Sequence, residues 1–163
     1  MPIRAFLSAL TLFSGVAIQA QEKSPDKLPP LNNKVLQFAT LKLGQQVGNG
    51  QCWTLADAAL RSAGARRPGR QGYRAYQFGK QLEKKDKLLP GDVLQMYQVV
   101  FRYPRSFQQF PLHTAIVSKV DGTKVEVLNQ NLGGDKKVQR TEFDLRGLKR
   151  GKIFAFRPQP RSR

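Results

Sequence analysis

Cysteine and histidine are almost absent from this chain of 163 residues, which holds one of each, Cys52 and His113. A single thiol excludes an internal disulfide, so the chain is not a disulfide-stapled scaffold. One cysteine and one histidine also fall short of the sets that hold structural zinc, and the sequence predicts no metal site and no cofactor. The chain is, however, long enough for one domain with a buried hydrophobic core.

Acidic residues are also scarce. Asp and Glu total 11 against 28 Lys and Arg, which gives a net charge of +17. Such a surface favours polyanions, namely nucleic acid, acidic lipid or lipopolysaccharide, or an anionic cell-wall polymer. The basic residues are spread along the chain and come with no phosphate-binding loop or nucleic-acid motif. The charge therefore predicts a class of binding surface and not a reaction.

The apolar run near the start is short for a membrane span. Arg4 precedes about 16 apolar residues, fewer than the ~20 that a bilayer requires. A secretory signal explains this pattern better than a membrane anchor, so residues 1–20 are predicted to be a signal peptide cleaved after Ala20. Residues 21–32, polar and proline-rich, are predicted to be a disordered leader. The protein is thus expected to be secreted, periplasmic or bound to the cell envelope.

Export changes the interpretation of Cys52. The outside of the cell is oxidising, and an unpaired cysteine in an exported chain indicates either intermolecular pairing or a reactive thiol. A third interpretation, a small buried core residue, is the commoner one for an isolated cysteine at a helix start.

Hydrophobic periodicity predicts two helices in the first half of the chain. Asn33 is expected to cap a helix that ends at Gly44. A second helix is expected from Cys52 to Ala63, with Gly64 as its stop.

The second half of the chain is predicted to form strands. They are predicted at residues 91–100, 113–120, 124–131 and 151–158. Residues 101–111 are predicted to be an inserted loop, and residues 73–82 a helical turn or two. Helices followed by strands predict an α+β fold, with the N-terminal helices packed on an antiparallel sheet. One domain is expected over residues 33–158, followed by a basic tail at residues 159–163.

Three side chains form a candidate site. Cys52 begins a helix, where unpaired N–H groups and the helix dipole stabilise a thiolate. His113 begins a strand and Asn129 lies in the partner strand, so the chain supplies a nucleophile, a base and an orienting amide. Each alone has an ordinary structural explanation, as a core thiol, a surface histidine or a turn residue. Their joint order on a helix and a hairpin favours a site.

The register of the hairpin around residues 121–122 decides which residue orients the base. A two-residue turn would place His113 opposite Gln130. A three-residue loop would place it opposite Asn129 and would also gather apolar residues on one face. We predict the three-residue loop, with His113 and Asn129 on the same face near hydrogen-bonding reach, because a one-residue slip would break that grouping.

The motifs around these residues resemble a known family. The segment QVGNGQCW, residues 46–53, is similar to the surroundings of the papain-type nucleophile. It is followed in order by PGDV (90–93), HTAIV (113–117) and NQN (129–131), as in the CHAP family of cysteine- and histidine-dependent amidohydrolases and peptidases. The resemblance covers about residues 33–158 and implies a compact papain-like fold. Many members have Glu where this chain has Asn129, and either side chain accepts a hydrogen bond from imidazole.

The resemblance implies a role for each site residue. Cys52 would attack an amide carbonyl, His113 would transfer protons and Asn129 would orient the imidazole. Beside the Cys52 N–H, the oxyanion donor implied is Gln46, with Gln45 and Gln51 as alternatives. Gln51 and Asn131 complete the candidate site as secondary residues.

The implied function is a secreted, monomeric amidase or endopeptidase that cleaves amide bonds in peptidoglycan. No specific nucleic acid is expected as a partner. Two rival functions remain open. The first is a secreted basic module on a papain-like scaffold that holds anionic envelope polymers without catalysis. The second is a nucleic-acid binder in which aromatic residues beside arginines, such as residues 101–103, stack on bases.

Overall fold

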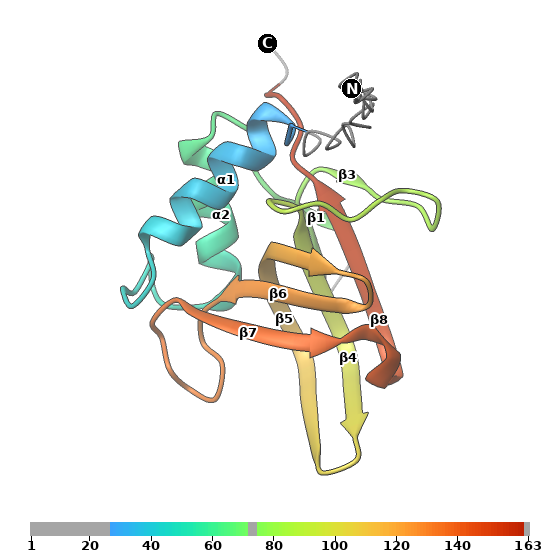
Figure 1. The fold of residues 1–163 in the computed structure, drawn as a ribbon. Helices are drawn as coiled ribbons and strands as arrows, with labels where there is room; N and C mark the ends of the chain where they lie inside the picture. The colour runs from blue at the N-terminus through green and yellow to red at the C-terminus, as the bar shows by residue number, and fades with distance from the viewer. Residues whose placement is uncertain (1–26, 72–74, 162–163) are drawn as a thin grey trace, which may run out of the picture.

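A computed structural model describes residues 27–71 and 75–161. The predicted signal peptide, residues 1–20, lies outside the described residues, as do residues 21–26 of the predicted leader. The described chain forms two helices packed on a six-stranded antiparallel sheet, with a small two-stranded sheet beside it (Figure 1). The prediction of an α+β fold with N-terminal helices on an antiparallel sheet is confirmed.

The two helices are α1, Pro30–Leu41, and α2, Cys52–Ser62. The predicted start of α1 at an Asn33 cap is wrong, because the cap position is Pro29, four residues earlier, and the helix begins at Pro30. Pro30 takes the first helical position, where an N–H group has no intrahelical partner and its absence costs nothing. The prediction for α2 is confirmed: Cys52 is its first residue, and Gly64 follows its end in the left-handed conformation, with φ of 71°.

The six-stranded sheet has the order β3-β8-β4-β5-β6-β7, and every neighbouring pair is antiparallel. Its strands are β3 (Lys80–Gln81), β4 (Val93–Tyr103), β5 (Ser106–Asp121), β6 (Lys124–Asn129), β7 (Gln139–Asp144) and β8 (Leu148–Arg157). A short 3-10 helix, η1 (Leu145–Gly147), joins β7 to β8.

The small sheet pairs β1 (Gly69–Gln71) with β2 (Ala75–Gln77). The helical turn predicted within residues 73–82 is therefore wrong, because β2 and β3 occupy five of the eight described residues of that segment, 75–82.

The inserted loop predicted at residues 101–111 is also wrong. These residues continue β4 and β5 into one long hairpin that projects from the body of the domain (Figure 1). Pro104 occupies the two-residue turn between Tyr103 and Ser106. Pro111 lies where the ladder skips a pair, opposite Gln98 with its φ of 53°, so its missing N–H interrupts no residue pair of the ladder. The two prolines that suggested a loop thus sit where a hairpin tolerates them.

The hairpin between β5 and β6 follows neither of the two registers considered. Asp121 pairs with Lys124, and a bulge near Ser118 then shifts the ladder so that Val117 pairs with Val127 and Ile116 with Leu128. The predicted three-residue loop is wrong. Beyond the bulge, the observed pairing nevertheless differs from the predicted pairing by an even number of residues. Each side chain there therefore keeps its predicted face of the sheet.

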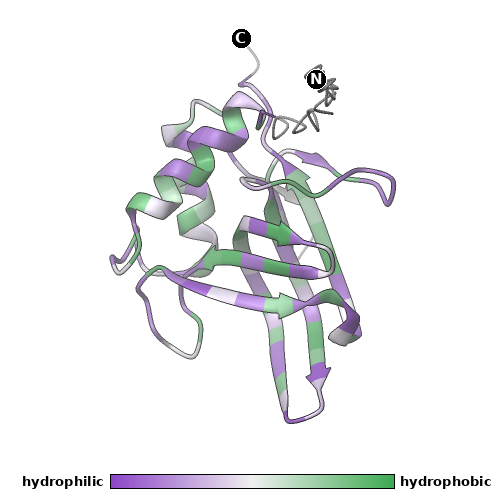
Figure 2. Ribbon diagram, viewed as in Figure 1, coloured by the Kyte–Doolittle hydropathy of each residue, from purple (hydrophilic) through white to green (hydrophobic). Residues whose placement is uncertain are grey.

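Hydrophobic residues form one core on each face of the sheet, and apolar and polar residues alternate along the strands (Figure 2). The first core lies between the helices and the sheet and contains Val35, Leu55, Leu60, Ile116 and Leu128. The second core lies on the other face of the sheet and contains Met96, Phe101, Ala115, Val127 and Phe143. The sheet is therefore buried on both faces where β5 and β6 meet α2.

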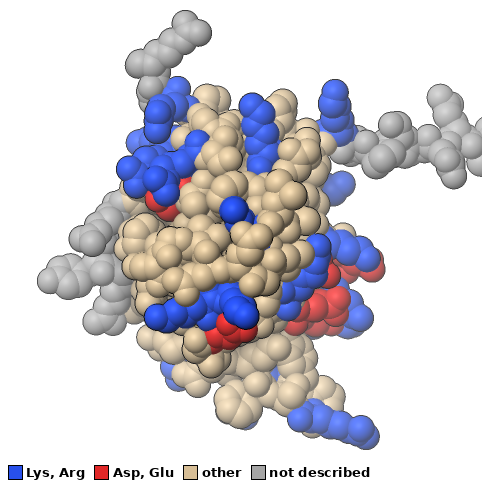
Figure 3. Space-filling view, turned by 90° about the vertical axis from the view of Figure 1, so that its left-hand side faces the viewer, with Lys and Arg blue, Asp and Glu red and all other residues tan. Residues whose placement is uncertain are grey.

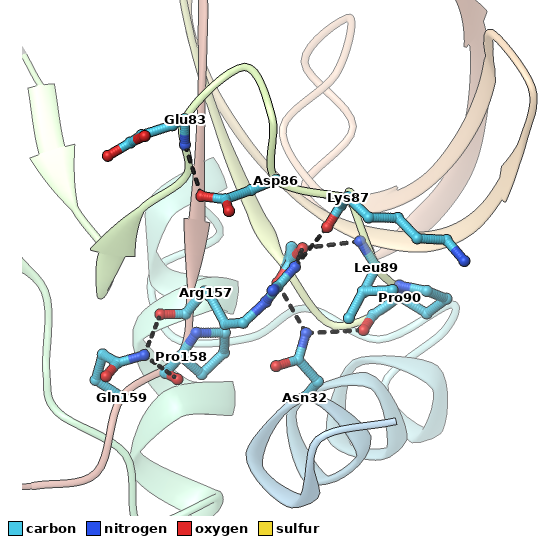
Figure 4. A network of polar contacts seen from close by, with 10 residues as sticks. Asn32, Glu83, Asp86, Lys87, Leu89, Pro90, Arg157, Pro158 and Gln159 are labelled. Carbon is cyan, nitrogen blue, oxygen red and sulfur yellow. Dashed lines mark hydrogen bonds and ion pairs between the residues drawn. The ribbon is translucent and has the colours of Figure 1, made fainter. Parts of the chain in front are cut away.

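A buried ionic network joins the two ends of the described chain (Figure 4). Asp92 is 0% exposed and accepts hydrogen bonds from Arg157 Nε at 3.1 Å and Nη2 at 2.9 Å, and from Asn32 Nδ2 at 2.8 Å. The Leu89 N–H is a further donor to Asp92. Gly91 has a φ of 83°, and a Cβ at this position would overlap the Asn32 carbonyl oxygen. We call Asn32, Asp92 and Arg157 the Asp92 network.

Candidate functional site

Cys52 reaches the start of α2 through a tight glycine turn. Gly48 and Gly50 both have positive φ, 58° and 80°, and a Cβ on Gly50 would lie 2.9 Å from side-chain carbons of Lys136. Gln51 precedes the helix in an extended conformation and makes no side-chain capping bond. The first N–H groups of a helix have no intrahelical acceptor, so this segment offers donors beside the half-buried Cys52 thiol.

His113 and Asn129 lie in direct contact on adjacent strands. His113 Nε2 is 3.2 Å from Asn129 Oδ1, and the two side chains are 6% and 1% exposed. The contact predicted from the sequence is confirmed. An amide oxygen can only accept, so Nε2 carries the hydrogen and the other ring nitrogen is left to exchange a proton with a nucleophile.

Thr141 on β7 orients Asn129 from the far side. Asn129 Nδ2 donates to Thr141 Oγ1 at 3.0 Å, which directs the amide oxygen toward His113. Thr141 is a site residue that the sequence did not predict. The strand that carries it was not predicted either, because QRTEFD has too few apolar residues to mark a strand.

Burial keeps the His113 ring neutral. The pKa of His113 is lowered from its usual value because the buried ring loses hydration, and the hydrogen bond that the ring donates to Asn129 opposes this shift only in part. The Phe110 ring packs beside it, with ring centroids 5.3 Å apart. A neutral imidazole oriented through Nε2 is the form that can act as a general base.

Gln130 and Asn131 join the His113 side of the site to the Cys52 side. Gln130 Nε2 donates to the Gln51 carbonyl at 2.7 Å, and Asn131 Nδ2 donates to Gln51 Oε1 at 3.1 Å. Gln51 directly precedes Cys52, and Gln130 directly follows Asn129. The predicted secondary residues Gln51 and Asn131 therefore contact each other at the start of α2, beside the end of β6 (Figure 1).

Gln46 has a different partner. Its side-chain amide donates to the Gly48 carbonyl at 3.3 Å, within the glycine turn, and its backbone forms an isolated bridge with Lys137. Gln45, one of the alternatives, accepts from Lys42 Nζ at 3.3 Å. The oxyanion role of Gln46 stays a prediction.

Metal-binding clusters and helices fit to span a membrane are both absent from the described residues. These residues contain no group of three or more His, Cys, Asp or Glu side chains placed to hold a metal ion. No helix within residues 27–71 and 75–161 is both long and apolar enough to cross a membrane.

Comparison with solved structures shows the fold. Ly7917 superimposes with a TM-score of 0.52 at 21% identity, over 77% of this chain and 62% of that one. Ly7917 solved with the hydrolyzing product of MDP gives a TM-score of 0.55 at 20% identity, over 78% of this chain and 63% of that one. This chain thus spans less than two thirds of either neighbour, and at these identities the likeness extends to the papain-like fold alone.

Sequence comparison adds a relative and a family. A protein of Debaryomyces hansenii named Altered inheritance of mitochondria protein 3 is 32% identical over 146 residues, which is 77% of this chain and 16% of that protein. Residues 31–163 match the AIM3/BBC1 cysteine proteinase-fold domain, which is most of the chain. This chain therefore belongs to the AIM3/BBC1 cysteine proteinase-fold domain family.

Proposed function

We propose that this domain is a cysteine-dependent amidohydrolase or peptidase, with Cys52 as nucleophile, His113 as base and Asn129 as the residue that orients the imidazole. The observation that carries the proposal is the buried hydrogen bond from His113 Nε2 to Asn129 Oδ1 at 3.2 Å. It leaves the second ring nitrogen for proton exchange, and the next residue along the chain, Gln130, bonds the segment that carries Cys52. This is the division of roles of a nucleophile, a base and an orienting group.

The proposed reaction has two halves. In the first, the free nitrogen of His113 takes the thiol proton, and the Cys52 sulfur attacks the amide carbonyl carbon. The negative charge passes to the carbonyl oxygen, beside the N–H groups at the start of α2. The C–N bond then breaks, and the leaving amine takes the proton from His113. In the second half a water molecule gives a proton to His113 and attacks the thioester, which releases the acid and restores the thiol.

The substrate class that we propose is an amide bond in peptidoglycan. Support comes from the likeness of the sequence motifs to CHAP cell-wall hydrolases and from the net charge of +17. Lys and Arg side chains lie in several separate groups on the face shown in Figure 3, among few acidic ones. Such a surface attracts an anionic envelope polymer without a dedicated groove. Export of the protein belongs to the same proposal.

A second function, a binding module without catalysis, is favoured by one observation. His113 is only 6% exposed, and burial opposes the imidazolium form that donates a proton to the leaving amine. In this alternative the same charges would hold the anionic polymer while Cys52 and His113 serve packing.

Hydrolysis by variants separates the two functions. We expect Cys52→Ala and His113→Ala each to abolish release of peptides or amines from peptidoglycan fragments, because each removes a group that makes or breaks a bond. Circular dichroism and thermal melting provide the control that the fold is kept. Wild-type turnover in either variant would contradict the mechanism.

Polymer binding gives the complementary measurement. Under both functions, binding of the intact chain to anionic polymer is expected to weaken steeply with salt and to survive Cys52→Ala. A wild-type protein that binds in this way and releases no product, with Cys52 reacting with iodoacetamide like an ordinary thiol at every pH, would favour the binding module.

A further inference from the structure

We infer that Gln130 is a positioning residue that holds the segment carrying Cys52 in register with the His113–Asn129 pair. The inference rests on the proposed function for its catalytic consequence, and on the contacts of Gln130 for its physical basis. Gln130 is 0% exposed and bonds to three different parts of the segment between α1 and the first turn of α2.

Both ends of the Gln130 amide are used. Its Oε1 accepts from the Val47 N–H at 3.1 Å. Its Nε2 lies 2.9 Å from the Val47 carbonyl, 2.7 Å from the Gln51 carbonyl and 2.9 Å from Thr54 Oγ1, so two N–H bonds are shared among three oxygens. The Thr54 hydroxyl in turn contacts the same two carbonyls, at 3.0 and 2.7 Å. We call Val47, Gln51, Thr54 and Gln130 the Gln130 network.

Only a neutral amide of this length satisfies the network. A carboxylate would face three oxygens with no hydrogen to offer them, and an apolar side chain would leave the Val47 N–H and the Gln51 carbonyl without this partner. The Gln51 carbonyl keeps its bonds from the Thr54 N–H and hydroxyl, so the buried group left unpaired is the Val47 N–H, and the residue that directly precedes the nucleophile loses its tie to Gln130. The effect of losing Gln130 is therefore a displaced start of α2.

The position of Gln130 in the chain makes it a link. Asn129 is the last residue of β6 and Gln130 the next one, and successive side chains of an extended chain point to opposite sides. One bonds His113 and the other bonds the turn before Cys52. Two adjacent residues of the chain thus contact the base and the segment that carries the nucleophile.

The Asp92 network supplies a matched control for substitution. Asn32 is also a 0% exposed amide, with hydrogen bonds to Asp92 and to the Pro90 carbonyl, and it shares no partner with Gln130. Gln130→Met and Asn32→Leu are both near-isosteric apolar replacements of a buried amide, so both are expected to lower the melting temperature by several degrees. Only the first touches the segment of Cys52.

The experiment measures the rate at which Cys52, the chain's one thiol, reacts with iodoacetamide between pH 5 and 9. It is run on the full chain at a temperature where all variants are folded. We expect Gln130→Met to change the rate at neutral pH by about tenfold to 100-fold, the scale of a 1 Å misplacement in a site, and Asn32→Leu to match the wild type. Equal rates for wild type and Gln130→Met would overturn the inference, as would equal changes in both variants.

The sign of the change tests the proposed function separately. If Cys52 and His113 work as a pair, the loss of Gln130 slows alkylation at neutral pH and hydrolysis falls with it. If Cys52 is an ordinary half-buried thiol, a loosened turn exposes it and alkylation becomes faster. Either sign supports the positioning role, and only the first agrees with the proposed mechanism.

A second variant covers the case in which Gln130→Met does not fold. Thr54→Val keeps the shape of the side chain and removes one of the three oxygens that Gln130 contacts. We expect a change of the same sign and smaller size, a few-fold, against the same Asn32→Leu control. A Thr54→Val rate equal to that of the wild type would count against the network as the element that positions Cys52.

Discussion

The two buried polar networks of this domain differ in charge. The Asp92 network contains an ion pair, in which Arg157 reaches a carboxylate that is 0% exposed. The Gln130 network contains only amides, a hydroxyl and backbone groups, and it adjoins a histidine whose pKa is lowered. A carboxylate near His113 would stabilise imidazolium and raise that pKa, whereas amides provide rigidity without charge. The comparison indicates that charge anchors the fold and neutral groups position the site.

The largest effect on stability is expected from breaking the ionic network. Asp92→Ala leaves the guanidinium of Arg157, the Asn32 amide and the Leu89 N–H without their acceptor. Removing one partner of a fully buried ion pair typically costs about 3–5 kcal/mol in the free energy of unfolding, and because the Arg157 side chain is 25% exposed we expect a loss at the lower end of that range. Urea denaturation measures the loss.

An exposed ion pair is the control for that substitution. Lys85 and Glu83 form a pair 3.0 Å apart on the surface, so Lys85→Ala is expected to leave the free energy of unfolding nearly unchanged. If Asp92→Ala proved no more damaging than Lys85→Ala, the Asp92 network would not be an anchor of the fold.

The neutral site is expected to make the fold sensitive to mild acid. Burial lowers the folded-state pKa of His113 below its unfolded value near 6.5, so the unfolded chain binds the proton first as the pH falls. Stability is therefore complete above about pH 6.5 and is lost progressively below it, down to the folded pKa. The carboxyl groups with lowered pKa, Glu126 and Asp144, lose their contributions at lower pH.

His113 is the chain's one histidine, so its share of the acid loss can be isolated. We expect urea denaturation at pH 7.5 and pH 5.5 to show a decrease for the wild type and a smaller one for His113→Gln. An equal decrease in both proteins would contradict the assignment of the acid sensitivity to His113.

The sequence predicted the parts of the fold that depend on local patterns. Glycine after a helix end placed the stop of α2, and alternation of apolar residues placed the cores of β4, β5, β6 and β8. The start of α1 was missed for a local reason, the proline at its first position, whereas the errors in the strands depend on how segments pair in the sheet. Pro104 and Pro111 look like loop residues until the long hairpin gives each a position without a donor.

The His113–Asn129 contact could be predicted from the sequence even though the hairpin loop could not. The His113–Asn129 contact depends on which face each side chain occupies, and face depends only on whether the register is shifted by an odd or even number of residues. The two-residue turn and the bulge near Ser118 together move the pairing beyond the bulge by an even number of residues from the predicted register. The His113–Asn129 contact was therefore predicted correctly although the loop was not. Gln130 was missed as a positioning residue because its partners come from the glycine turn, and Thr141 was missed because it lies on a strand that was not predicted.

The smallest effect is expected where a single hydroxyl supports the neutral site. Thr141→Val removes the acceptor of Asn129 Nδ2 and leaves a buried donor unpaired, at a cost of about 1–3 kcal/mol in the free energy of unfolding. Asn129 also loses the contact that directs its oxygen to His113. Because the hydrogen bond that His113 donates to Asn129 raises the pKa of His113, we expect that pKa to fall further below its usual value in Thr141→Val.

Thr141→Ser, which keeps the hydroxyl, is the matched control and should titrate like the wild type. The ring of His113 can be followed by NMR without ambiguity, since no other histidine is present. If the Thr141→Val protein titrated at the wild-type pH, Asn129 would hold its orientation without Thr141, and the β6 strand end alone would position the imidazole. A lowered pKa of His113 in Thr141→Val, together with slower hydrolysis, would show that Thr141 on β7 also positions the site, as the residues of the Gln130 network do on the other side of Asn129.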